Sequence, residues 1–153
     1  FGGRLIGGDG AKYINSPENK LFRKRHSLYL IHKAKHAMRE QGQAVLVEGY
    51  TDAIRLHMHG FTNAVATLGT SLTEGQADIL GRFASQCLIC YDADAAGQEA
   101  TLRGMYLLQS RGLDVRVVSL AAGNDPDELL QQEKGRQQFR RRKKKPFRSL
   151  CII

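Results

Sequence analysis

The residues best suited to chemistry are carboxylates that follow predicted strands. Three short apolar runs, residues 44–47, 87–91 and 115–120, predict buried strands. Acidic residues follow each run in turn: Glu48 and Asp52, then Asp92 and Asp94, then Asp125 and Asp127. Because the carboxyl ends of parallel strands meet at one edge of an open α/β sheet, we expect these side chains to converge.

Convergence of six carboxylates would require bound cations. Two like charges ~4 Å apart repel by about 4 kcal/mol at an effective dielectric constant near 20. Oxygen ligands without His or Cys suit Mg²⁺ or Mn²⁺ rather than zinc. The pattern therefore predicts a site for hard divalent cations at the carboxyl edge of the sheet.

Each acidic residue also has an alternative role. Asp residues at strand ends commonly cap helices and form turns. Asp125 precedes Pro126, which is the pattern of an N-cap followed by proline in the first helical position, so Asp125 and Asp127 are candidate caps as well as ligands. Glu48 is a candidate general base or metal ligand, and Asp52 a candidate ligand or an orienting residue.

The order of the predicted elements indicates the fold class. Helices are expected at residues 27–40, 52–59, 74–84 and 97–111, and a further strand at residues 64–66. Thr73 is placed to cap the helix that begins at Glu74. Alternating strands and helices predict an α/β fold with a mostly parallel sheet flanked by helices.

Composition and charge restrict the functional class. The 153 residues are 42% hydrophobic and 25% charged, which is typical of one globular domain. We see neither a signal peptide nor an apolar run long enough to span a membrane, so a cytoplasmic protein is expected. The net charge of +8 is unevenly placed, since residues 1–39 are basic, residues 40–133 are acidic and residues 134–153 carry no acidic residue. A basic region beside an acidic metal site is typical of an enzyme that acts on a phosphate backbone.

Zinc binding is not expected. Cys87 and Cys90 are three residues apart on a predicted strand, so their side chains should point to opposite faces and lie in the core. His32 and His36 are four residues apart on a basic helix, where a solvated surface is expected. The chain contains no set of four Cys and His residues with metal-ligand spacing.

The acidic motifs and their flanking sequence resemble a known family. EGYTD at 48–52 followed by DADAAG at 92–97 resembles a Toprim domain, whose hallmarks are a Glu after one strand and a DxD after another. Four flanking motifs occur in the order found in the catalytic core of bacterial DnaG-type primases: KYINSPEN at 12–19, LFRK at 21–24, NAVATLGTSLT at 63–73 and NDPDE at 124–128. Thr51 and Ala93 stand where this family usually has Met and Gly. The resemblance covers roughly residues 1–133.

The resemblance implies an activity and a set of site residues. It implies metal-dependent synthesis of an RNA primer from NTPs on a single-stranded DNA template, with the replicative helicase as a partner of the full-length family. Two or more Mg²⁺ or Mn²⁺ ions would be held by Glu48, Asp92 and Asp94, with Asp125, Asp127 and Asp52 assisting. The family's basic subdomain faces the template and the nucleotide, which implies phosphate contacts for four residues: Arg4, Lys12, Asn15 and Lys24.

The expected domain organisation follows the same resemblance. Residues 1–43 would be part of a basic N-terminal α+β subdomain with a connecting helix, and residues 44–133 the Toprim domain. Residues 134–153 depart from the family pattern, and we expect a disordered or aberrant basic tail, with a nucleic-acid-binding arm as the alternative. The chain begins with Phe1, so we expect a fragment that primes weakly. Two other functions stay open: another Toprim enzyme, either a topoisomerase or a nuclease, or a non-catalytic nucleic-acid-binding fragment.

Overall fold

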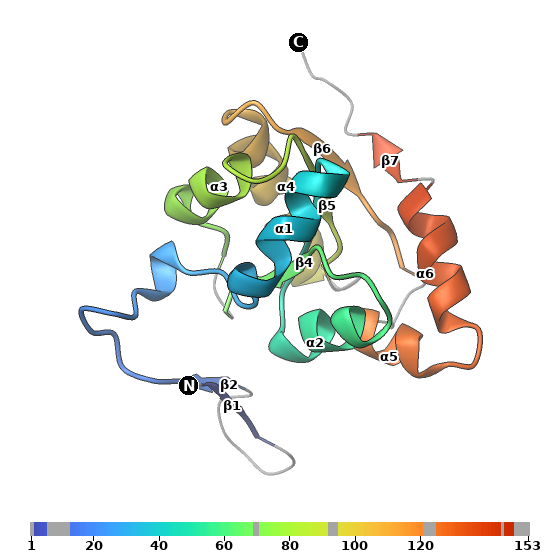
Figure 1. Ribbon diagram of the computed structural model, residues 1–153, viewed down its shortest axis with the longest axis horizontal. Coiled ribbons are helices and arrows are strands. Elements are labelled where there is room, and N and C mark those ends of the chain that lie inside the picture. The colour runs from blue at the N-terminus through green and yellow to red at the C-terminus, as the bar shows by residue number, and fades with distance from the viewer. Residues whose placement is uncertain are drawn as a thin grey trace.

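The computed structural model describes residues 2–5, 13–68, 71–91, 95–120, 125–144 and 146–148. Its strands are β1 Gly2–Arg4, β2 Tyr13–Asn15, β3 Gln43–Val47, β4 Ala64–Ala66, β5 Gln86–Ile89, β6 Asp114–Val117 and β7 Phe147–Arg148. Its helices are α1 Ile31–Gln41, α2 Tyr50–Met58, α3 Glu74–Gly81, α4 Ala95–Gln109, α5 Pro126–Gln131 and α6 Gly135–Lys144 (Figure 1). None of these helices is long and apolar enough to cross a lipid bilayer.

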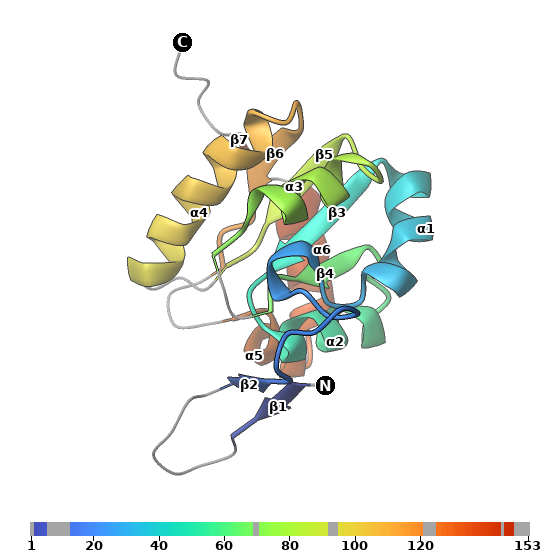
Figure 2. The ribbon, with the colours of Figure 1, turned by 90° about the vertical axis from the view of Figure 1, so that its left-hand side faces the viewer.

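The central sheet confirms the predicted α/β class. Its strand order is β4-β3-β5-β6-β7, with the first four strands parallel and β7 antiparallel to β6. Helices α1, α3 and α4 contribute to the hydrophobic cluster on one face of the sheet, whereas α2, α5 and α6 contribute to the cluster on the other face. The molecule therefore has three layers, which Figures 1 and 2 show from two sides.

Alternation along the strands decides which side chain faces which layer. In β3, Ala44 and Leu46 belong to the α1-side cluster, while Val45 and Val47 belong to the α2-side cluster. Cys87 and Cys90 likewise belong to opposite clusters and are both fully buried, as predicted for core residues. Burial raises the pKa of the Cys87 thiol to about 12.

A small antiparallel sheet, formed by β1 and β2, lies outside the main sheet and next to α2 (Figure 2). A Cβ atom on Gly2 would lie 2.5 Å from the Tyr50 ring, so glycine permits β1 to approach the first turn of α2. The side-chain amide of Asn15 donates to the Leu68 carbonyl oxygen at 3.4 Å, just beyond β4. The N-terminal segment therefore reaches the carboxyl edge of the main sheet.

The helix predicted from residue 27 begins later, at Ile31. The peptide N–H of Tyr29 donates to the Ala66 carbonyl at 2.9 Å, and Ala66 donates back to Tyr29 at 3.4 Å. This bridge holds Tyr29 in an extended conformation at the edge of β4. Leu30 then adopts a left-handed conformation with φ of 62°, and α1 can begin only after it.

The expectation of a disordered tail is wrong for residues 135–144, which form α6. Phe139 in α6 is fully buried and meets the Phe61 ring edge-on, with ring centroids 4.8 Å apart. A Cβ atom on Gly135 would lie 1.9 Å from the Leu129 carbonyl oxygen, so only glycine allows α6 to follow α5 this closely. One aromatic anchor and one glycine therefore dock a helix whose other residues are mostly charged.

Candidate active site at the carboxyl edge of the sheet

Glu48 lies where β3 ends, at the edge predicted to carry the site. It is half-buried, and its Oε1 atom is shielded from solvent. Tyr91 follows β5, the neighbouring strand, and its hydroxyl is buried with no hydrogen-bond partner among the described residues. Burial chiefly raises the pKa of the Tyr91 phenol, and the nearby Cys87 and Glu48 raise it further. Glu48 and the end of β5 therefore share one electrostatic environment.

The DxD residues, Asp92 and Asp94, lie outside the described residues. The chain reaches them directly from Tyr91, and the next described element, α4, begins at Ala95. In the sequence, the two aspartates stand between β5 and α4. Their role as metal ligands stays a prediction.

Asp52 connects the first turns of two helices. It is only 5% exposed, and its Oδ2 atom accepts a hydrogen bond of 3.2 Å from the Gly49 N–H at the start of α2. Its Oδ1 atom accepts a second hydrogen bond of 3.2 Å from the Asp127 N–H at the start of α5. A carboxylate at two helix N-termini satisfies donors that have no partner within their own helices. This geometry favours the orienting role for Asp52 over that of a direct ligand.

Asp127 is held by a cation from α2. Its Oδ1 atom accepts a hydrogen bond of 2.6 Å from Nε of Arg55, in an ion pair whose side chains are 13% and 32% exposed. Sequence reasoning missed Arg55, because nothing in the motif pairs residues so distant along the chain. The only available signal was its position one helical turn after Asp52, on a helix predicted to begin at the site.

Asp125 caps α5, as one of its two predicted roles required. Its Oδ1 atom accepts a hydrogen bond of 2.7 Å from the Glu128 N–H, and Pro126 occupies the first position of the helix. Thr73 caps α3 in the same manner, with Gln76 completing a capping box. Both cap predictions are confirmed.

Gln76 is a second residue that sequence reasoning missed. It is fully buried, and its side-chain amide donates to the carbonyl oxygens of Lys24 at 3.1 Å and Ser27 at 2.9 Å. A third contact, at 3.4 Å, reaches the carbonyl oxygen of Thr67 after β4. Gln76 thereby fastens the basic N-terminal segment to the loop at the carboxyl edge. The spacing between Thr73 and Gln76 predicts the helix cap but not these contacts with the N-terminal segment.

The four predicted phosphate-binding residues are placed unevenly. Asn15 lies at the edge through its contact with Leu68, and Lys24 is half-buried in a 3₁₀ turn that packs against α3. Arg4 has a described backbone in β1, paired with Tyr13, whereas Lys12 lies outside the described residues. The structure thus brings Asn15 to the edge occupied by Glu48 and places Lys24 next to α3.

The donor set fits hard divalent cations but depends on the DxD residues. Asp125 and Asp127 each accept a hydrogen bond on the Oδ1 atom. The Oδ2 atom of each carboxylate can therefore contact another partner. Within the described part of the chain, no three acidic, His or Cys side chains lie close enough together to hold a metal ion. The described acidic side chains at this edge offer carboxylate oxygens, the ligands that magnesium-like ions prefer.

Comparison with known protein families shows which family this chain belongs to. A family model described as Toprim-like matches residues 45–130. Because this match covers more than half of the chain, the chain belongs to the Toprim-like family. A second model, described as the N-terminal domain of the DNA primase catalytic core, matches residues 1–35.

The individual proteins that this chain resembles are DNA primases. The DNA primase of Halalkalibacterium halodurans is 50% identical over 131 residues, which are 86% of this chain and 22% of that relative. The crystal structure of Aquifex aeolicus primase superposes with a TM-score of 0.90 at 42% identity, over 97% of this chain and 37% of that chain. A DnaG primase catalytic domain bound to single-stranded DNA gives a TM-score of 0.84 at 35% identity, over 96% and 48% of the two chains.

These similarities confirm the resemblance to the DnaG-type primase core that the motifs predicted. The chain spans about a quarter of the length of the curated relatives and less than half of these solved structures.

Proposed function

We propose that this chain is part of the catalytic core of a DNA primase, which synthesises RNA primers from NTPs on a single-stranded DNA template. The observation that carries the proposal is that two family models match successive parts of one chain. The primase-specific model matches residues 1–35 and the Toprim-like model matches residues 45–130, with Glu48 at the predicted edge. A relative with 35% identity has been solved with single-stranded DNA, which supports such a template here. We extend the proposal to the family's helicase partner and to a cytoplasmic location.

The proposed reaction is nucleotidyl transfer. The 3′-hydroxyl of the growing RNA attacks the α-phosphorus of the incoming NTP, a new P–O bond forms, and pyrophosphate leaves with the electrons of the broken bond. Bound Mg²⁺ or Mn²⁺ ions would lower the pKa of the attacking hydroxyl and stabilise charge on the leaving oxygens. Glu48, Asp92 and Asp94 would hold these ions, and Asp125 and Asp127 would assist through their second carboxylate oxygens.

The surrounding residues would position this machinery. Asp52 fixes the starts of α2 and α5 relative to each other, and Arg55 fixes the carboxylate of Asp127. Rigid support of this kind matters because an orienting partner commonly contributes a factor of about 10–100 to metal affinity or activity. Arg4, Lys12, Asn15 and Lys24 would contact the phosphates of template and nucleotide.

The test replaces the matching segment of Aquifex aeolicus primase by residues 1–133 and measures RNA primer synthesis on single-stranded DNA. We expect primers with Mg²⁺ or Mn²⁺, and their loss in Asp92→Ala and Asp94→Ala variants that keep the native circular dichroism. Glu40→Gln, an exposed acidic residue at the end of α1, is the control and should retain activity. Full activity of either aspartate variant would refute the site, and DNA cleavage without NTPs would point instead to a nuclease.

A further inference from the structure

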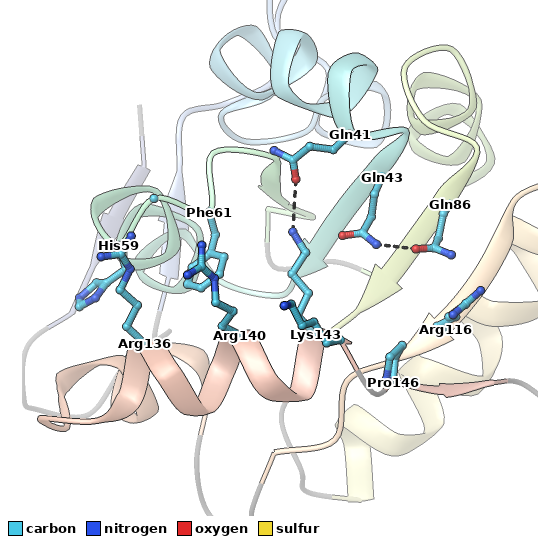
Figure 3. A pocket seen from close by; sticks show the side chains of 12 residues that line it. Gln41, Gln43, His59, Phe61, Gln86, Arg116, Arg136, Arg140, Lys143 and Pro146 are labelled. Carbon is cyan, nitrogen blue, oxygen red and sulfur yellow. Dashed lines mark hydrogen bonds between the residues drawn. The ribbon is translucent and has the colours of Figure 1, made fainter.

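A strongly basic pocket lies at the opposite edge of the sheet from the carboxylates. Gln43 and Gln86, the first residues of β3 and β5, line it together with Arg116 of β6 (Figure 3). In a parallel sheet the amino and carboxyl ends of the strands lie at opposite edges. The cavity measures about 550 Å³, which is within the range of small-ligand sites. This pocket is therefore separate from the candidate active site.

Helix α6 supplies most of the positive charge. Four of its side chains line the pocket, and Figure 3 shows three of them, Arg136, Arg140 and Lys143, projecting from one side of the helix. They recur three or four residues apart, as one helix face requires. No acidic residue lines this cavity in the described part of the chain.

Two cations of this pocket, Arg136 and Arg140, are not neutralised by the part of the chain that the structure describes. Arg116 is paired with Asp114 at 3.0 Å, whereas Arg136 and Arg140 form no ion pair with any described residue. The helix dipole favours cations in the last turn of α6, but it opposes Arg136, which lies in the first turn. Intrahelical electrostatics therefore does not account for the arrangement.

Lys143 is held in place at the centre of the pocket. Its Nζ atom lies 3.3 Å from Oε1 of Gln41, 3.4 Å from Oδ1 of Asn63 and 5.8 Å from the centroid of the Phe61 ring. The side chain is half-buried. Its pKa is lowered chiefly by desolvation and, to a smaller extent, by the positive charge of Arg140. Two cations thus share a partly desolvated pocket, which an anion would stabilise.

We propose that this pocket, formed by α6 and the amino ends of β3, β5 and β6, binds a chain of phosphate groups. Guanidinium groups match phosphate oxygens with paired hydrogen bonds, and several cations at helical spacing suit a ligand with successive charges rather than a single anion. Both a free oligophosphate and the backbone of a nucleic acid offer this chemistry. The site is independent of the metal-binding edge and of the proposed reaction.

The test is calorimetric titration of the whole chain with inorganic tripolyphosphate and, separately, with a single-stranded oligonucleotide. EDTA is present throughout so that metal ions at the opposite edge do not contribute. The test variant is Arg136→Gln with Arg140→Gln. Its matched control, Lys134→Gln with Arg141→Gln, removes the same charge from exposed residues that do not line the pocket.

We expect saturable binding that the test variant weakens at least about tenfold and the control leaves within about twofold. If the oligonucleotide is the ligand, the salt dependence of log K should also become shallower by about 1.4, because each lost phosphate contact contributes about 0.7. Binding of tripolyphosphate alone would identify a free oligophosphate as the ligand, and binding of the oligonucleotide alone would identify the nucleic-acid backbone. No binding of either probe, or equal losses in both variants, would overturn the proposal.

Discussion

Replacing Asp52 tests whether this carboxylate supports the site or lines it. Its two oxygens satisfy the buried N–H groups of Gly49 and Asp127, each at 3.2 Å. Leaving one buried donor unsatisfied costs about 1–3 kcal/mol, and bonds of this length lie at the weaker end of the range. For both donors together, we therefore expect Asp52→Ala to lower the free energy of unfolding by about 2–4 kcal/mol.

Asp52→Asn gives a graded comparison. The amide oxygen of Asn can accept one of the two hydrogen bonds, while its NH₂ group faces the other donor, so an intermediate loss is expected. The measurement is urea unfolding in EDTA, monitored by circular dichroism. The variants are compared at the same m-value, which is the slope of unfolding free energy against urea concentration. EDTA removes any contribution of bound metal ions from the comparison.

The control for this series is Glu99→Ala. Glu99 pairs with Arg103 one helical turn away, and the two side chains are 70% and 57% exposed. An exposed pair of this kind contributes about 0.3–0.5 kcal/mol. If Asp52→Ala were no more destabilising than this control, the account of Asp52 as the connection between α2 and α5 would be wrong.

Three further predictions concern other parts of the fold. Phe139→Ala should lower the free energy of unfolding by about 3–5 kcal/mol, because it empties a fully buried site; a change below about 1 kcal/mol in urea unfolding would show that α6 does not dock. Arg55→Gln should lower the free energy of unfolding by about 1–2 kcal/mol, because Asp127 loses its cation. This value lies between those for exposed and buried ion pairs, and an unchanged unfolding midpoint would contradict the prediction. In the native chain Cys87 should resist maleimide between about pH 7 and 9, because burial raises the pKa of its thiol to about 12. In urea Cys87 should react, and labelling of the native chain detected by peptide mass spectrometry would refute its burial.

The sequence predicted the parallel strands of the sheet and two helix caps because these features depend on local patterns. Apolar β-branched runs identified β3, β4, β5 and β6, and the Asp-Pro and Thr-x-x-Gln patterns marked the starts of α5 and α3. The alternation of side chains along β5 also placed Cys87 and Cys90 on opposite faces. Each of these signals lies within a few residues of the feature that it predicts.

The features that the sequence did not predict depend on contacts between distant segments. The late start of α1 follows from the bridge between Tyr29 and Ala66, which no local propensity contains. Helix α6 is ordered through Phe139 and Gly135, although its run of basic residues alone indicated a disordered tail. The partner of Asp127, Arg55, is also distant in sequence, so its ion pair became visible only in the folded chain.

Calorimetric titration with Mn²⁺ shows whether the acidic edge binds divalent metal ions. We would compare the chain with an Asp92→Asn, Asp94→Asn variant and with a control, Glu40→Gln with Glu133→Gln, that neutralises two exposed acidic residues. We expect saturable binding that is lost in the first variant and unchanged in the control. Absence of binding to the folded chain, or equal binding by all three proteins, would contradict this expectation.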